Sequence, residues 1–372
     1  MRIAQVANFY GPSSGGLRTA LHALGHGYVG HGDEVLLVVP GDHDADEDTP
    51  HGRRITLHSP VLPGTGGYRA ITRLGAVHDA LTEFAPDALE VSDRTTLASL
   101  GPWATRRGIN ATFIAHERVD RVVGVAMPAA LEGAVPGLAA RHVRWLTQRF
   151  PSIVATTAFA GEEFARAGHP VTTVPLGVDL DRFHPGHHSP LVRRRHAEDG
   201  EVLMLLASRL SPEKNPHIAI DAARELARRG RPVRLVCAGA GPLDGSLRRR
   251  AAGAPVEFLG FVNDRARFAA LLATADLILA PGPHETFGLS ALEALASGTP
   301  AVVSATSALP EVVGDAGVAA ANTATAFADA VDALLSRDGR GRRAAARARA
   351  EQFPWEATVS RMRAVHGTPV AA

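Results

Sequence analysis

The sequence predicts an α/β protein built from two doubly wound, Rossmann-like domains that face each other across a cleft. The chain has 372 residues, which is enough for two domains of ordinary size. Short apolar and β-branched runs alternate with helical stretches in both halves, as in parallel sheets with crossover helices. Turn-forming residues gather at 183–190 and separate the two alternations. We therefore expect domains at 1–180 and 181–355, followed by a helical segment at 356–372.

The expected strands follow the apolar runs in chain order. In the first domain they are 2–7, 34–39, 88–91, 112–115 and 153–156. In the second domain they are 202–207, 233–238, 256–259, 277–280 and 301–303. Ligands of such sheets gather at the carboxyl ends of the strands, so we expect the site in the cleft between the domains.

Composition excludes several classes of protein. Hydrophobic residues make up 45% and charged residues 21%, which is typical of a globular chain rather than a disordered one. No run approaches the roughly 20 apolar residues of a membrane span, and residues 2–7 read as a strand rather than a secretion signal. The single cysteine, Cys237, lies in an apolar run and indicates a buried thiol. Without a span or a secretion signal, we expect a cytoplasmic protein. A net charge of +1 gives no reason to expect nucleic acid as a partner.

The segment 285–300 follows the expected strand 277–280 and contains a short helix closed by Gly298. The amides of 287–289 would lie at the positive N-terminus of this helix, where they can bind phosphate or sugar oxygens. Helical side chains lean toward the N-terminus, so Glu293 can reach back beside the same ligand as Glu285. Either glutamate alone is more simply a solvated surface residue, but the sixteen-residue pattern favours a site for a hydroxylated, phosphorylated ligand.

A second candidate segment, 208–216, follows the expected strand 202–207. Asn215 is predicted to cap a helix that begins at Pro216 and runs to Gly230. Arg209 and Lys214 then lie at a strand end beside a helix N-terminus, which suits a diphosphate. A pair of surface cations is the alternative, but Lys214 is the only lysine beside 38 arginines, out of 39 basic residues.

Two glycine-containing loops are weaker candidates. The loop 8–18 lacks the three glycines of the dinucleotide fingerprint, although Gly15 and Gly16 can present amides to a phosphate. Gly239 and Gly241 end the expected strand 233–238 in a similar way. A plain strand-to-helix turn explains the first loop, and tight packing explains the second, equally well.

The first domain supplies further candidates at its strand ends. His116 follows the expected strand 112–115 and points into the expected cleft. On topology alone, the candidates for binding a second substrate are Tyr68 and Arg69 after the glycine loop 63–67, with Glu90, Asp93 and Arg94 at another strand end. No metal triad is visible near His116.

The segment 141–150 mixes arginines with Trp145 and Phe150. Such a segment can touch an anionic membrane surface at the inner face of the membrane. An ordinary amphipathic helix is the simpler interpretation, because the net charge of the chain is near zero.

These motifs resemble the family-4 retaining glycosyltransferases of the GT-B fold. The family signature has two glutamates separated by seven residues around Phe-Gly-Leu, followed by Glu-Ala, Ala, Gly and Pro, and segment 285–300 contains each element. The resemblance implies that Glu285 and the amides of 287–289 hold the donor hexose and diphosphate. It implies that Glu293 holds the nucleoside ribose, and that Arg209 and Lys214 neutralise the leaving diphosphate without a metal.

The resemblance also assigns the remaining residues. His116 would meet the donor hexose, and the last helix would cross back onto the first domain. Catalytic roles are expected for His116, Arg209, Lys214 and Glu285. Donor contacts are expected from Gly15, Gly16, Arg209, Lys214, Phe261, Val262, Glu285, Thr286, Phe287, Gly288, Leu289 and Glu293.

We therefore expect a retaining transferase that moves a hexose from a nucleoside-diphosphate sugar to an acceptor hydroxyl, with no cofactor or metal. Both glutamates are assigned to hydroxyl binding, which argues against a double displacement of the glycosidase type. GDP-mannose is the favoured donor, with UDP-glucose and UDP-N-acetylglucosamine as alternatives. The acceptor is left open between a small molecule, a glycan and a lipid-linked glycan. An epimerase and a catalytically silent nucleotide-sugar-binding protein are the rival functions.

Overall fold

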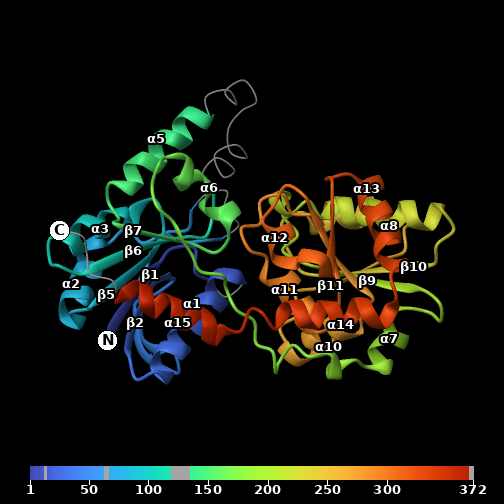
Figure 1. Ribbon diagram of the computed structural model, residues 1–372, viewed down its shortest axis with the longest axis horizontal. Coiled ribbons are helices and arrows are strands. Elements are labelled where there is room, and N and C mark those ends of the chain that lie inside the picture. The colour runs from blue at the N-terminus through green and yellow to red at the C-terminus, as the bar shows by residue number, and fades with distance from the viewer. Residues whose placement is uncertain (12–14, 63–66, 119–134, 368–372) are drawn as a thin grey trace. The chain divides into compact units, whose positions relative to one another are not determined.

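The computed structural model describes residues 1–11, 15–62, 67–118 and 135–367. The chain divides into two compact units (Figure 1). Unit 1 comprises Met1–Gly177 and Trp355–Ala372, and unit 2 comprises Val178–Pro354. The first boundary thus follows residue 177 rather than residue 180. The chain leaves unit 2 at Pro354, beside the point where it entered, since Val178 and Pro354 form a parallel bridge.

Unit 1 is built on an eight-stranded sheet. Its order is β3-β4-β2-β1-β5-β6-β7-β8, and every pair is parallel except β3 with β4. The strands are β1 (Arg2–Ala7), β2 (Glu34–Gly41), β3 (Ala45–Thr49), β4 (Gly52–His58), β5 (Ala88–Ser92), β6 (Asn110–Ala115), β7 (Ser152–Ala155) and β8 (Thr172–Thr173). The sequence pattern predicted β1, β2, β5, β6 and β7 but not β3, β4 and β8.

Helices cover both faces of the unit 1 sheet. On one face α1 (Gly16–Gly30) packs beside α15 (Trp355–His366), the last helix of the chain (Figure 1). A Cβ at Gly27 of α1 would lie 2.3 Å from Val359 Cγ2, so glycine permits this close contact. The other face packs against α2 (Leu74–Phe84), α3 (Leu100–Thr105), α5 (Val135–Thr147) and α6 (Ala158–Arg166). Strand residues alternate between the two cores, as the period-2 pattern of a strand requires.

Unit 2 is built on a six-stranded, fully parallel sheet of order β11-β10-β9-β12-β13-β14. The strands are β9 (Val202–Ala207), β10 (Val233–Ala238), β11 (Val256–Gly260), β12 (Leu277–Ala280), β13 (Ala301–Ser304) and β14 (Gly317–Ala320). Only β14 was not predicted. Cys237 on β10 is fully buried, and burial raises the pKa of its thiol to about 12, which confirms the buried-thiol interpretation.

Unit 2 also has helices on both sides of its sheet (Figure 1). α8 (Pro216–Arg228) and α13 (Ala324–Leu335) pack together on one face. α10 (Arg265–Thr274), α11 (Leu289–Ala296) and α14 (Gly339–Ala350) pack together on the other. The remaining helices are α7 (Pro190–His196), α9 (Asp244–Arg250) and α12 (Leu309–Val313). Of the helices in the described part of the chain, none is both long enough and apolar enough to cross a membrane.

Each sheet has a point where the direction of winding reverses. In unit 1 this switch point lies between β1 and β5, and in unit 2 it lies between β9 and β12. The loops that leave such neighbouring parallel strands in opposite directions open a crevice at their carboxyl ends, where doubly wound sheets bind ligands. The fold therefore directs attention to the loops that follow β1, β5, β9 and β12.

Candidate active site

The two strongest sequence motifs meet at the switch point of unit 2. Arg209 and Lys214 lie in the loop after β9, and Glu285 lies in the loop after β12. Lys214 Nζ donates to Glu285 Oε1 at 2.6 Å, although 71 residues separate them. The Lys214 side chain is 28% exposed and the Glu285 side chain is 22% exposed. The Lys214–Glu285 ion pair thus lies partly exposed in the loops at the carboxyl ends of β9 and β12.

The loop after β9 differs from its prediction in one respect. Residues Pro212–Lys214 form a 3₁₀ turn, and Asn215 follows in the left-handed region at φ +46°. Pro216 is the first residue of α8, as expected, but the Asn215 side chain makes no capping bond. The N-cap prediction for Asn215 was therefore wrong in its mechanism, and α8 ends at Arg228 rather than Gly230. The left-handed residue turns the chain directly after Lys214 and leads into α8.

The loop after β12 leads into α11 through Gly288. Gly288 has φ +84°, and a Cβ there would lie 2.2 Å from Leu309 Cδ2. α11 begins at Leu289 without a side-chain cap and ends before Gly298, which has φ +73° in the expected C′ position. The Phe287 ring is buried and packs edge-on against Phe353, with 6.2 Å between the ring centres. The motif thus anchors one aromatic side chain in the core and presents the N-terminus of a helix at the switch point.

Glu293 lies one turn into α11 and is buried. Arg265, the first residue of α10, donates from Nη2 to Glu293 Oε1 at 2.9 Å. Burial raises the pKa of the Glu293 carboxyl, while Arg265 and Arg182 oppose that rise and Asp179 adds to it. Glu293 was predicted from the sequence motif, whereas Arg265 was not. The only signal was its position three residues after Val262, one of the expected donor contacts.

The remaining candidates in unit 2 are described by their exposure and by their backbone packing. Phe261, directly after β11, is 52% exposed, and Val262 beside it is half-buried. Thr286 is half-buried between Glu285 and Phe287. Gly239 and Gly241 have a packing reason, because Cβ atoms there would lie 1.9 Å from Ser208 O and 2.4 Å from Leu210 O. Of the two interpretations left open for these glycines, the structure supports tight packing.

In unit 1, the loop after β1 is tied to its neighbours by Asn8. The Asn8 side chain donates to Thr96 Oγ1 at 2.9 Å and accepts from the Ile71 amide at 2.8 Å. Gly15 and Gly16 are exposed at the start of α1, which has no side-chain cap. Residues 12–14 of this loop lie outside the described residues. The expected amide donors are thus placed at a helix N-terminus beside the unit 1 switch point.

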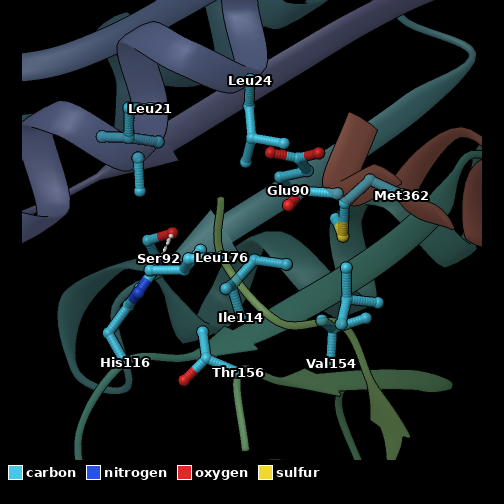
Figure 2. A pocket seen from close by; sticks show the side chains of 13 residues that line it. Leu21, Leu24, Glu90, Ser92, Ile114, His116, Val154, Thr156, Leu176 and Met362 are labelled. Carbon is cyan, nitrogen blue, oxygen red and sulfur yellow. Dashed lines mark hydrogen bonds between the residues drawn. The ribbon is translucent and has the colours of Figure 1, made fainter. Parts of the chain in front are cut away.

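His116 follows β6 at the same edge of the sheet. Its Nε2 lies 2.9 Å from Ser92 Oγ at the end of β5 (Figure 2). Burial lowers the pKa of His116 to about 4, with Arg94 acting in the same direction and Glu90 opposing it. The imidazole is therefore neutral near pH 7. It borders a small cavity of about 20 Å³, lined by α1, α15 and the sheet, with room for roughly one water.

Glu90 lies across that cavity from His116 (Figure 2) and is held inside the fold. Its carboxylate accepts from Gln5 at 2.8 Å, from Tyr28 at 2.5 Å and from His366 of α15 at 2.8 Å. Burial opposes ionisation, but these bonds outweigh it and lower the pKa of the carboxyl. Glu90 therefore anchors the last helix to unit 1.

Comparison with known proteins gives this arrangement a family. Residues 14–182 match the family model described as Glycosyltransferase Family 4, and residues 190–352 match that of Glycosyl transferases group 1. The chain is 48% identical over 370 residues to a GDP-mannose-dependent alpha-(1-6)-phosphatidylinositol dimannoside mannosyltransferase of Mycobacterium tuberculosis, covering 99% of this chain and 96% of that protein. The chain belongs to glycosyltransferase family 4. It is a glycosyltransferase that uses a nucleotide sugar.

More distant similarities agree with this family. A D-inositol 3-phosphate glycosyltransferase of Nocardia farcinica is 30% identical over 278 residues, covering 69% of this chain and 61% of that protein. The solved sucrose-phosphate synthase of Thermosynechococcus elongatus has a TM-score of 0.80 at 20% identity, covering 98% of both chains. WaaG, a glycosyltransferase of lipopolysaccharide biosynthesis, has a TM-score of 0.73 at 17% identity, covering 98% of this chain and 99% of that one. Both structures support the GT-B fold.

Of the acceptor candidates of this glycosyltransferase, Glu90 is buried as described above, and the other four divide into two pairs. Asp93 accepts from the amides of Thr95 and Leu97, and Arg94 donates to Glu163 at 2.9 Å, so both side chains are bonded within unit 1. Tyr68 and Arg69 are half-buried. The Tyr68 ring packs edge-on to Phe9 at 6.0 Å, and Arg69 donates to the Ser59 carbonyl at 2.5 Å. The glycine loop at 63–66 lies outside the described residues. Binding of the acceptor by these four side chains stays a prediction.

The basic, aromatic segment 141–150 forms most of α5 and its C-terminal end. Ala139, Val143 and Leu146 are buried against unit 1, which confirms an amphipathic helix. Leu138 and Trp145, two turns apart, are 49% and 36% exposed. Among the described side chains of α5, the large apolar Leu138 and Trp145 are thus exposed beside a buried face.

Metal binding has no visible site in the part of the chain that the structure describes. No group of three or more His, Cys, Asp or Glu side chains converges there in a way that could hold an ion. The positive charges at the unit 2 switch point come from Arg209 and Lys214, both half-buried. A metal-independent reaction stays a prediction.

Proposed function

We propose that this glycosyltransferase moves mannose from GDP-mannose to a mannosylated phosphatidylinositol, with retention at the anomeric carbon. The observation that carries the transfer site is the meeting of Lys214 and Glu285 at the switch point of unit 2, beside the N-terminus of α11. The donor and acceptor are inferred from the mannosyltransferase that is 48% identical over nearly the whole length of both proteins. That relative's name specifies a lipid-linked acceptor, so a soluble acceptor is the less favoured alternative.

Retention follows from the same inference. GDP-mannose is an α-glycosyl donor, and the relative forms an alpha-(1-6) linkage. In the reaction we propose, the diphosphate leaves toward Arg209, Lys214 and the amides at the start of α11, and it takes the acceptor proton on the face it leaves. Electrostatic stabilisation of the leaving group and positioning then supply most of the rate enhancement.

Metal independence is part of the proposal. Two fixed cations and a helix N-terminus can neutralise a diphosphate without a divalent ion. We expect turnover to be unchanged by a chelator such as EDTA. A loss of activity that magnesium or manganese restores would contradict this part.

The function is tested by incubating the purified protein with labelled GDP-mannose, UDP-glucose or UDP-N-acetylglucosamine, with and without phosphatidylinositol dimannoside. We expect release of GDP that depends on the acceptor, and a labelled lipid product only from GDP-mannose. Tight binding of a nucleotide sugar without turnover would favour a silent binding protein. Release of free sugar from a UDP donor without acceptor would favour an epimerase-like enzyme.

A lipid acceptor requires that the enzyme reach a membrane surface, and we assign that contact to α5. Leu138 and Trp145 are exposed, Arg141 and Arg144 are exposed beside them, and the Arg149 guanidinium lies 3.8 Å from the centre of the Trp145 ring. No acidic residue occurs in 136–150. Exposed apolar side chains among cations are typical of helices that lie on anionic bilayers.

Vesicle sedimentation tests this contact. The wild-type protein should sediment with vesicles that contain anionic phosphatidylinositol, and less with neutral phosphatidylcholine vesicles. Trp145→Glu and Leu138→Glu should abolish sedimentation, whereas Val29→Glu on α1, which is 41% exposed, is the matched control and should not. Equal binding by all three variants would contradict the assignment.

A further inference from the structure

Arg265 is the charged partner of Glu293, and neither the sequence motif nor the comparisons assign it a role. It begins α10, 28 residues before Glu293, and its Nη2 donates to Glu293 Oε1 at 2.9 Å. The guanidinium also lies over two rings, 5.2 Å from the centre of Phe183 and 5.6 Å from that of Phe268. Those two rings pack edge-on at 6.3 Å. The side chain is therefore held in one orientation although it is 45% exposed.

We propose that Arg265 is a positioning residue that fixes the Glu293 carboxylate for the ribose hydroxyls of the donor and so makes the enzyme selective for a ribonucleotide. The proposal deepens the proposed function, because it rests on Glu293 as the ribose ligand. A bond to Oε1 restricts rotation of the carboxylate and leaves acceptor positions on the group for a hydroxyl pair. The geometry is then set before the donor arrives, which reduces the ordering cost of binding.

The second contribution of Arg265 is to keep Glu293 ionised. Burial raises the pKa of the Glu293 carboxyl, and Arg265 is the first of the groups that oppose this rise. A protonated carboxyl would lose part of its capacity to accept from ribose hydroxyls. Removal of Arg265 should therefore let Glu293 take up a proton at a higher pH, and donor affinity should fall as the pH falls.

Few other charged groups act on Glu293. Arg182 and Asp179, on the segment that enters unit 2, contribute with opposite signs and lie 3.5 Å apart as an ion pair. Arg347 of α14, which packs on α11, is bonded to backbone carbonyls, including that of Ala296 at 2.9 Å. α12 also packs on α11, and its one charged residue, Glu311, is exposed. Arg265 is thus the cation in direct contact with the carboxylate.

Arg248 offers a matched control in the same unit. Its Nε donates to Asp244 at 2.8 Å, and its guanidinium lies 4.8 Å from the centre of the Phe258 ring. Arg248 is 50% exposed, close to the value for Arg265. It therefore combines the same two kinds of contact, but its carboxylate partner is on its own helix α9 and not in the donor motif.

The experiment measures the affinity for GDP and for 2′-deoxy-GDP by calorimetry, so that it does not depend on transfer. The proteins are wild type, Arg265→Gln, Arg265→Lys, Glu293→Gln, the double variant R265Q/E293Q and Arg248→Gln. At neutral pH we expect R265Q to weaken GDP binding about tenfold, the worth of a hydrogen bond to a charged group, and to weaken 2′-deoxy-GDP binding much less. R265K should restore part of the loss, and R248Q should match wild type.

Two further results decide the proposal. Between about pH 8 and about pH 5.5, GDP affinity should fall more steeply for R265Q than for wild type, as linkage to a protonating carboxylate requires. Adding R265Q to E293Q should cost nothing more, because the positioned group is already gone. Wild-type pH dependence in R265Q, or an undiminished R265Q effect in the E293Q background, would overturn the proposal. Failure of the proposed function would appear separately, as GDP binding without mannosyl transfer by the wild-type enzyme.

Discussion

Gly288 belongs to the donor motif, residues 285–300, and the structure allows the cost of replacing it to be estimated. An alanine there would have to adopt φ +84°, which costs about 1–2 kcal/mol for a residue with a Cβ. Its Cβ would lie 2.2 Å from Leu309 Cδ2, and Leu309 is 1% exposed, so the methyl must move inside a packed core. Overpacking of that kind costs about 1–3 kcal/mol. Gly288→Ala should therefore destabilise unit 2 by about 2–5 kcal/mol in total.

The assay must report on unit 2. All three tryptophans belong to unit 1, so tryptophan fluorescence does not report on the unfolding of unit 2. They are Trp103, Trp145 and Trp355. Hydrogen exchange of the buried amides in β9 and β12 measures the free energy of opening this unit directly. Donor affinity should fall at the same time, because the substitution displaces the start of α11.

A double-mutant cycle separates the two costs. In a Leu309→Ala background the clash is absent, so Gly288→Ala should cost only the backbone term of about 1–2 kcal/mol. The reasoning is refuted if Gly288→Ala alone leaves the opening free energy unchanged. It is also refuted if the cost is the same in both backgrounds.

Three further predictions concern single side chains. Lys214→Arg should lower kcat by about 10²-fold with the fold intact, because a guanidinium cannot replace a compact cation bonded to Glu285 at 2.6 Å; near-normal turnover would contradict the site. His366→Phe leaves the buried Glu90 without one of its hydrogen-bond donors, so unit 1 should be destabilised by about 3 kcal/mol. Urea unfolding followed by tryptophan fluorescence measures this cost, and a cost near zero would show that Glu90 does not anchor the last helix. The pKa of His116 is lowered from 6.5 to about 4 in the folded protein. The contribution of His116 to stability is therefore present near pH 7 and is lost as the pH falls from about 6.5 toward 4. An NMR titration of the His116 ring with a midpoint near 6.5 would disprove this prediction.

The sequence predicted the buried parallel strands because each is an apolar run between turn formers. β3 escaped prediction because its sequence Ala-Asp-Glu-Asp-Thr is charged and exposed, as suits an antiparallel edge strand. β4 begins with Gly-Arg-Arg and has few apolar residues in succession. β14 is short and consists of glycine, one valine and two alanines, and β8 has only two residues. These strands form because a neighbouring strand already offers hydrogen bonds, which local sequence does not record.

The donor motif was predictable because its residues lie close together in the sequence. The Lys214–Glu285 bond and the Arg265–Glu293 bond were not, since they depend on which strands become neighbours and which helices pack. Asn215 shows a local limit, because asparagine serves both as a helix cap and as a left-handed residue, and the packing of the loop after β9 selects the second.

Addition of a single hexose to phosphatidylinositol dimannoside tests the central claim most directly. The purified enzyme, the lipid in anionic vesicles and GDP-mannose are combined, and the lipid is examined by mass spectrometry and by NMR of the new anomeric centre. We predict one added hexose in α linkage, absent with UDP-glucose and strongly reduced by Glu285→Gln. An unchanged lipid, a β linkage, or equal product from UDP-glucose would contradict the account.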